Sequence, residues 1–290
     1  MAAAPNDVER AWLDAEYNAR AGIPDHQDIF ARWTRDSATL QDHERSRAKL
    51  DVSYGPDPLQ AFDVYPARHS TGADPLLVFV HGGYWQSLDK SQFGFLAEPY
   101  ISRGICFAAV NYRLAPDVGM DEIVEDVRSA VGSLYERAPE YGADPAQLYL
   151  SGHSAGGHLT AMLMSTAWPE LGLPADIIKG GCAISGLYDL EPIQNCYLND
   201  VLGMDIATSQ RNSPVQHAPS SSAPLLLTVG GDESSEFHRQ QAEFARIWST
   251  RGLACKVVDQ PDGHHFDAVE RLGEADDPLF GAVFELIRNA

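Results

Sequence analysis

The stretch QLYLSGHSAGGHLTAMLMSTA, residues 147–167, decides the predicted fold. Residues 147–151 form a mostly apolar run of the kind found in a buried strand. Residues 152–156 then read Gly-His-Ser-Ala-Gly, a G-x-S-x-G pattern, and residues 157–167 continue with apolar side chains at helical spacing. We therefore predict a strand, a tight turn and a helix in succession, with Ser154 at the turn.

A serine at such a turn is placed to act as a nucleophile. The strand–turn–helix context is the one in which a nucleophile elbow exposes its serine above a sheet. The backbone of an elbow is strained, and a Cβ at a flanking glycine would collide with the neighbouring strand or helix. A pattern this short can occur by chance, so the prediction depends on the strand before it and the helix after it. That context makes Ser154 the candidate nucleophile.

Strand-like and helix-like patterns alternate through the rest of the chain. The clearest apolar run, Leu-Leu-Val-Phe-Val at 76–80, is typical of a strand buried on both faces. This alternation predicts an α/β fold with a mostly parallel central sheet and helices on both faces. The expected strands are 59–65, 76–81, 105–111, 147–151, 177–184, 225–230 and 255–260, and the further expected helices are 121–137, 236–250 and 277–289.

The length of 290 residues suits one large domain, and we expect a single domain over residues 1–290. Residues 1–49 are mostly polar with a helical pattern, which predicts an N-terminal helical segment laid against the main domain. The connection 187–223 is long, irregular and rich in Pro, Asn and Ser. Loops of that length usually cover or line a site, so we expect a lid or a site-lining loop there.

Residues 81–85, His-Gly-Gly-Tyr-Trp, follow the apolar run at 76–80. They resemble the HGGG-type loop whose backbone N–H groups face the nucleophile in α/β-hydrolases. A tetrahedral intermediate places negative charge on one oxygen, and backbone amides can stabilise that charge. The expected donors to this oxyanion hole are the amides of Gly83, Tyr84 and Ala155.

The chain order of this fold is serine, then acid, then histidine. Residues 230–234 read Gly-Gly-Asp-Glu-Ser, and counting a G-x-x-D/E pattern from Gly230 favours Glu233 as the acid, with Asp232 as the alternative. The base is expected after the last strand, where His265 is the candidate and His264 the alternative. A histidine suits this role because its pKa lets it take and return a proton near neutral pH.

The formal net charge is −20, from 41 acidic and 21 basic residues. Nucleic acids and anionic membranes bind clustered Lys and Arg, so the expected partner is a small-molecule substrate, with no nucleic acid and no membrane. The start of the chain lacks a secretory pattern, which predicts a cytoplasmic protein. The four cysteines show no C-x-x-C spacing and the histidines no H-E-x-x-H, so no cofactor and no metal are expected. The oligomeric state is left open.

Several motifs resemble those of the serine-dependent arylformamidases, or kynurenine formamidases. The likeness runs from about residue 50 to residue 270. It rests on the HGGxW segment at 81–85, the G-x-S-x-G pattern at 152–156, and the stretches 185–193, 211–214, 236–240 and 265–266. In the animal members an aspartate occupies the position aligned with Glu233, which is a departure in this chain. The resemblance implies Gly83 and Tyr84 as oxyanion donors, and hydrolysis of N-formyl-L-kynurenine to L-kynurenine and formate in tryptophan catabolism.

Two other functions are compatible with these residues. A carboxylesterase acting on short-chain or aryl esters would use the same triad, since a triad does not specify the acyl group. A hydrolase-fold binding protein without catalysis is the second alternative. For the substrate pocket, Tyr84 and Trp85 are candidate aromatic lining residues, with packing beneath the loop as the other role open to them.

Overall fold

The computed structural model describes residues 6–219 and 221–289. Residues 1–5, 220 and 290, which belong to the predicted N-terminal segment, the predicted lid and the end of the predicted domain, lie outside this description. In the described residues an eight-stranded sheet has the order β1-β2-β4-β3-β5-β6-β7-β8. The strands are β1 (Lys49–Ser53), β2 (Ala61–Tyr65), β3 (Asp74–Val80), β4 (Cys106–Val110), β5 (Ala143–His153), β6 (Ile178–Ile184), β7 (Leu225–Thr228) and β8 (Cys255–Val257).

The sheet is mixed but mostly parallel. β1 pairs with β2, and β2 with β4, in antiparallel fashion, whereas every later neighbouring pair is parallel. The parallel part brings the carboxyl ends of β3, β5, β6 and β7 to one edge of the sheet. In open α/β sheets this edge is where ligands bind.

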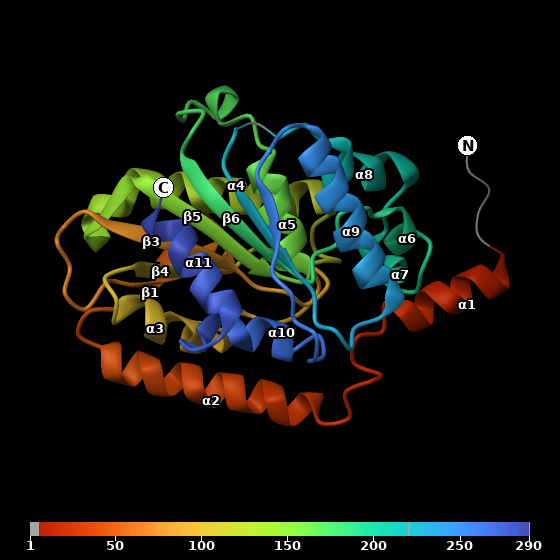
Figure 1. Ribbon diagram of the computed structural model, residues 1–290, viewed down its shortest axis with the longest axis horizontal. Helices are drawn as coiled ribbons and strands as arrows, with labels where there is room; N and C mark the ends of the chain where they lie inside the picture. The colour runs from red at the N-terminus through yellow and green to blue at the C-terminus, as the bar shows by residue number, and fades with distance from the viewer. Residues whose placement is uncertain (1–5, 220, 290) are drawn as a thin grey trace.

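Helices cover both faces of the sheet (Figure 1). Because side chains alternate along a strand, Leu76, Val78 and Val80 of β3 pack towards α4, α5 and α9, whereas Leu77 and Phe79 pack towards α2, α3, α10 and α11. The helices are α1 (Asp7–Glu16), α2 (His26–Glu44), α3 (Glu98–Ile101), α4 (Met120–Arg137), α5 (Ala155–Met164), α6 (Glu191–Gln194), α7 (Asn199–Leu202), α8 (Ile206–Arg211), α9 (Ser235–Thr250), α10 (Asp267–Glu270) and α11 (Pro278–Arg288), with 3₁₀ turns at Lys90–Gln92, Gly94–Ala97, Ala138–Tyr141, Trp168–Leu171, Pro214–Gln216 and Arg271–Gly273.

The predicted α/β fold is confirmed, with differences at the N-terminus and at the edges of elements. All seven expected strands occur, but several are shorter than predicted, and the helix after Ser154 is Ala155–Met164 rather than 157–167. The strand β1 was missed because its sequence, Lys-Leu-Asp-Val-Ser, is mostly exposed at the sheet edge and shows little apolar patterning. The connection 187–223 is not structureless, since its described residues hold α6, α7 and α8.

The helices of the described residues include none that is both long and apolar enough to cross a membrane.

Candidate active site

Ser154 lies at the turn between β5 and α5. Its backbone has φ 57° and ψ −118°, a conformation that non-glycine residues rarely adopt. The flanking glycines make the turn possible. A Cβ on Gly152 would lie 2.2 Å from the carbonyl oxygen of Gly156, and a Cβ on Gly156 would lie 1.9 Å from the carbonyl oxygen of Val80. The local sequence therefore produces the expected elbow for a steric reason.

His265 and Glu233 form a buried hydrogen-bonded pair. The Nδ1 atom of His265 lies 2.6 Å from Oε2 of Glu233, and the two side chains are only 5% and 1% exposed. With its Nδ1 proton donated to this carboxylate, the neutral imidazole has its lone pair on Nε2. Both residues follow carboxyl ends of the parallel part of the sheet, which is why loops distant in sequence meet here.

The other carboxylate oxygen of Glu233 is also held. The backbone N–H of Gly230 donates to Oε1 at 2.8 Å, and the hydroxyl of Ser185 donates to the same atom at 2.5 Å. Ser185 directly follows β6 and has φ 50°. Sequence reasoning gave no role to Ser185, although its position after a parallel strand placed it at this edge of the sheet.

The alternative acid and base line a neighbouring cavity of about 400 Å³ but take no part in the Glu233–His265 pair. Asp232 is exposed and accepts a hydrogen bond from the backbone N–H of Gly263 at 3.2 Å. His264 accepts hydrogen bonds at Nδ1 from the backbone N–H groups of Phe266 and Asp267. The structure thus brings Glu233 to His265, and gives Asp232 and His264 local roles in loops.

His153 and His158, on either side of the serine, make local hydrogen bonds. Nε2 of His153 lies 2.8 Å from the carbonyl oxygen of His265, and Nε2 of His158 lies 2.7 Å from that of Asn212. Burial lowers the pKa of both imidazoles below the usual value, to about 4 for His158, and the nearby His265 adds to the effect at His153. Both rings are therefore neutral at pH 7. His153 supports the loop that carries His265.

The loop at 82–85 has a strained backbone beside the elbow. Gly83 has φ 107°, and a Cβ there would lie 2.1 Å from the carbonyl oxygen of Ser87. Tyr84 and Trp85 also have positive φ values, 50° and 58°. Strain of this kind persists only where surrounding contacts hold it. Here the Ser87 hydroxyl donates to the Gly83 carbonyl at 3.0 Å, and the Tyr84 hydroxyl donates to the Tyr17 carbonyl at 2.6 Å.

Trp85 does not line the site. Its side chain is fully buried, its ring meets that of His158 edge to face, and its indole N–H donates to Nδ1 of His158 at 3.2 Å. Of the two roles left open for Trp85, these contacts fit packing beneath the loop, because the strained loop turns the indole inward. Tyr84, in contrast, lines two of the three cavities described next.

Ser154 and His265 share one small cavity with Gly83 and Tyr84. Its volume is about 20 Å³. Ala155, the third expected oxyanion donor, is buried at the start of α5, immediately after Ser154. The structure therefore places the expected nucleophile, base and oxyanion loop around a common space, with Glu233 directly behind the base.

The segment between α1 and α2 forms a wall of this site. Ala19 lines the small cavity and also two larger ones beside it, of about 400 and 290 Å³. The larger of these two also touches Glu233 and His265, and the other touches Gly83 and Tyr84. Sequence reasoning placed residues 1–49 against the main domain but missed this role. The Gly22-Ile23-Pro24 break between two helical patterns was the available signal for a loop.

The same segment is tied to the helix that follows the acid loop. Tyr17 is buried, and its hydroxyl donates to Oε2 of Glu236 at 2.7 Å and accepts from the Gln240 amide at 2.9 Å. Oε2 of Glu16 accepts from the hydroxyl of Ser235 and from the backbone N–H of Glu236, at the start of α9. These contacts hold residues 16 and 17 in place beside the site.

The connection 187–223 lines one side of the candidate active site. Of its described residues, Tyr197 and Leu198 line the 290 Å³ cavity beside Gly83 and Tyr84. Its arginine, Arg211, instead pairs with Asp121 at 2.7 Å on the surface. This connection therefore lines the site at one side, and the segment between α1 and α2 covers more of it.

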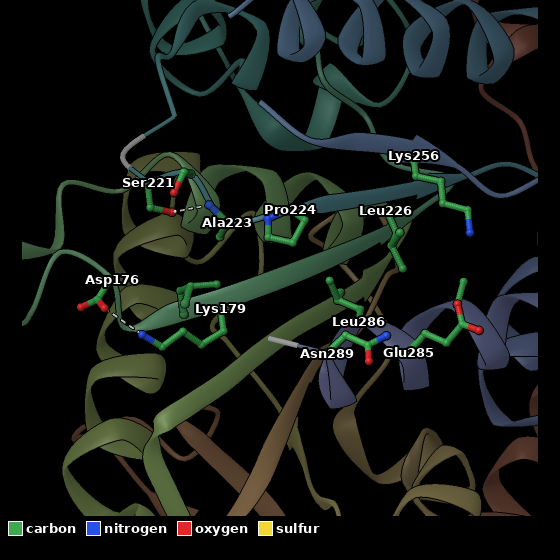
Figure 2. Close-up of a pocket in the computed structure, with 13 residues that line it drawn as sticks. Asp176, Lys179, Ser221, Ala223, Pro224, Leu226, Lys256, Glu285, Leu286 and Asn289 are labelled. Carbon is green, nitrogen blue, oxygen red and sulfur yellow. Dashed lines mark hydrogen bonds and ion pairs between the residues drawn. The ribbon is translucent and has the colours of Figure 1, made fainter. Parts of the chain in front are cut away.

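A cavity of about 610 Å³ lies away from these residues (Figure 2). It is lined by Ile178 and Lys179 at the start of β6, with Lys256 and Leu286 nearby. In the sheet Ile184, at the other end of β6, pairs with His153. Because a strand rises roughly 3.3 Å per residue, the two ends of β6 lie roughly 20 Å apart. This cavity is therefore separate from the candidate active site.

Within residues 6–219 and 221–289, no group of three or more His, Cys, Asp or Glu side chains could hold a metal ion.

The mixed sheet, the elbow after β5 and the helices on both faces define the class, which is that of the α/β-hydrolases. A solved structure from Silicibacter sp. TM1040, named provisionally as a thioesterase, matches with a TM-score of 0.83 and 30% identity, over 94% of this chain and 98% of that chain. The BD-FAE family matches residues 62–171.

Two relatives indicate the family more closely. Kynurenine formamidase from Salmo salar is 37% identical over 281 residues, which cover 93% of this chain and 92% of the relative. Kynurenine formamidase from Danio rerio is 36% identical over 245 residues, covering 81% and 82%. The chain is a hydrolase and belongs to the kynurenine formamidase family of α/β-hydrolases.

Proposed function

We propose that the protein hydrolyses N-formyl-L-kynurenine to L-kynurenine and formate. Ser154 is the nucleophile, His265 the general base and Glu233 the acid, and the amides of Gly83, Tyr84 and Ala155 form the oxyanion hole. The observation that carries this proposal is the cavity shared by Ser154, His265 and the strained loop, with the His265–Glu233 pair behind it. The similarity to named kynurenine formamidases supports the choice of substrate.

In the first half of the reaction His265 takes the Ser154 proton at Nε2 while Oγ attacks the formyl carbon. The carbonyl oxygen becomes an oxyanion, which backbone amides stabilise. When the intermediate collapses, the carbon–nitrogen bond breaks and His265 gives its proton to the aryl nitrogen, which leaves as an amine. The product on the enzyme is a formyl ester of Ser154.

In the second half water replaces the amine. His265 removes a proton from the water, the resulting hydroxide attacks the formyl ester, and collapse of the second intermediate returns the proton to Ser154 and releases formate. Glu233 keeps the Nδ1 proton of His265 in place and stabilises the imidazolium that forms in each half. Gly230 and Ser185 in turn hold the carboxylate in position.

The size of the cavity favours a small acyl group. About 20 Å³ is close to the volume that one water-sized group needs, whereas the two neighbouring cavities are far larger. A formyl group carries only hydrogen on its carbonyl carbon and is the smallest acyl group. The larger leaving group then has the neighbouring cavities available.

The test is a kinetic comparison of N-formylkynurenine, simple formanilides, and nitrophenyl esters of increasing acyl length. We expect kcat/KM to be highest for N-formylkynurenine and to fall steeply from formyl to butyryl esters. A preference of orders of magnitude for acetyl or butyryl esters would instead identify a carboxylesterase. Failure of a fluorophosphonate probe to label Ser154 would identify a binding protein without catalysis.

We also propose that residues 1–290 act as one domain, because the N-terminal segment contributes to the same site as the loops after β3, β5 and β7. The cytoplasmic location stays a prediction.

A further inference from the structure

Arg20 lies at the mouth of the site. It belongs to the segment between α1 and α2, and it lines both the small cavity that contains Ser154 and the 290 Å³ cavity beside Gly83 and Tyr84. Its Nη2 atom is 3.5 Å from the hydroxyl oxygen of Ser87, and its guanidinium carbon is 5.7 Å from the centre of the Phe30 ring. The side chain is exposed, so the guanidinium can be reached from solvent.

Arg20 differs from most arginines of the chain in its charged surroundings. The chain carries 41 acidic and 21 basic residues, and most of its arginines form ion pairs. In residues 6–219 and 221–289, no carboxylate lies within ion-pair distance of Arg20. It is also the sole Lys or Arg among the described residues that line the three cavities around Ser154. Because its guanidinium has no carboxylate partner among these residues, Arg20 can still bind the carboxylate of a ligand.

The overall charge makes this cation important for an anionic ligand. A net charge of −20 repels a carboxylate unless a local positive charge offsets the field at the point of entry. A guanidinium presents a planar fork of N–H donors that matches a carboxylate. The Ser87 hydroxyl oxygen accepts from one arm of this fork, and the Phe30 ring limits where the fork can lie.

We propose that Arg20 binds the carboxylate at the amino-acid end of the substrate, which makes it a specificity-determining residue. This inference rests on the proposed function, because it concerns the far end of the same substrate. With the formamide at Ser154, the carboxylate is separated from the reacting carbon by the aryl ring and the ketone chain. Its receptor therefore belongs at the mouth of the site, where Arg20 lies, and the substrate class is that of aryl formamides that carry a carboxylate.

The experiment compares two substrates that differ only in the carboxylate. One is N-formylkynurenine, and the other is the same compound with its carboxylate converted to a primary amide; formate release is measured for both. We expect the unmodified protein to prefer the carboxylate substrate by about 10- to 100-fold in kcat/KM, because a site built around a charged hydrogen bond rejects a ligand that lacks it. Arg20→Gln should abolish most of this preference by raising KM for the carboxylate substrate. Arg20→Lys, which keeps the positive charge, should retain part of the preference.

Arg35→Gln is the matched control, since Arg35 is an exposed arginine of the same N-terminal region that pairs with its neighbour Asp36. It should keep the preference of the unmodified protein. Thermal melting of Arg20→Gln should match that of the control, which separates a binding effect from unfolding. Retention of the full preference for the carboxylate in a folded Arg20→Gln variant would overturn the proposal.

A second substrate pair separates this inference from the proposed function. It consists of two aryl acetates, one with and one without a carboxylate on a side chain of the aryl group. If neither formamide is hydrolysed but the acetates are, the proposed function is wrong. The effect of Arg20→Gln on the acetate pair then decides the role of Arg20 by itself, with an unchanged preference counting against it.

Discussion

The hydroxyl of Tyr84 donates a hydrogen bond of 2.6 Å to the backbone carbonyl of Tyr17. This bond joins the strained loop at 82–85 to the segment between α1 and α2, which are far apart in the sequence. Burial raises the pKa of the Tyr84 hydroxyl well above its usual value, so the group stays a donor at any physiological pH. The bond therefore couples the position of the proposed oxyanion loop to that of the segment that carries Arg20.

Removing this hydroxyl tests the coupling. Tyr84→Phe removes the shorter of two hydrogen bonds to the Tyr17 carbonyl and leaves the 3.5 Å one from the Tyr197 hydroxyl, and we expect a loss of about 1 kcal/mol in the free energy of unfolding. Because the segment is then held less firmly, KM for N-formylkynurenine should rise more than kcat falls. Urea unfolding and steady-state kinetics measure the two effects. Tyr135→Phe is the control, since Tyr135 lies on α4, away from the site; equal effects of the two substitutions would contradict the coupling.

Replacing the nucleophile or the base should remove nearly all activity. For Ser154→Ala and His265→Ala we expect kcat to fall by several orders of magnitude, on the order of 10⁶ in well-studied triads. The double variant should be about as slow as either single one, because the two groups act as a unit. Formate release is the measurement. A loss of less than tenfold at either position would refute the assignment.

The two neighbouring carboxylates should behave differently. Glu233→Gln removes the charge that orients His265, and we expect kcat to fall by about 10³- to 10⁴-fold. Asp232→Asn alters an exposed side chain that accepts a hydrogen bond from the backbone N–H of Gly263, and it should change kcat by less than about threefold. The reverse order of effects, measured with the same substrate, would assign the acid to Asp232.

The elbow glycine should be intolerant of any side chain. The Cβ introduced by Gly156→Ala would lie 1.9 Å from the Val80 carbonyl oxygen, so we expect a loss of more than about 3 kcal/mol in stability or failure to fold. Gly281→Ala in α11 is the matched control, because its added Cβ would meet nothing within 4 Å apart from its chain neighbours and the backbone of its own helix. It should stabilise the protein by about 0.5–1 kcal/mol. Chemical unfolding of both variants measures the contrast, and similar stabilities would count against the steric argument.

Buried histidines should make stability depend on pH. Burial lowers the pKa of His158 to about 4, whereas a histidine in the unfolded chain titrates near 6.5. Between these values the unfolded state binds the proton that the folded state does not, so stability falls as the pH drops from 6.5 towards 4. His158 should contribute about 1 kcal/mol per pH unit in this window.

Urea unfolding at pH 7 and pH 5 measures this effect. His158→Asn lacks the titrating ring and should show a shallower decline on acidification than the unmodified protein. An identical decline in the two proteins would mean that His158 takes no part in the pH dependence.

Short sequence patterns made the elbow and the strands at the site predictable. The turn at Ser154 depends on glycines two residues to either side, and the apolar run at 76–80 forms a strand because both of its faces are buried. The order serine, acid, histidine followed from the chain order of the fold. The glycine spacing, the apolar run and the chain order can all be read without the tertiary structure, so the amino-acid sequence by itself predicted these features.

Only the tertiary structure decided which side chains meet. It placed Glu233 rather than Asp232 beside His265, turned Trp85 inward onto His158, and brought Arg20 to the mouth of the site. The sequence pattern favoured Glu233 but left Asp232 open, and it did not separate the roles of Tyr84 and Trp85. Backbone strain and packing give each member of these two pairs its own contacts. The approach of the N-terminal segment to the loop after β3 likewise depends on long-range packing, which no local pattern encodes.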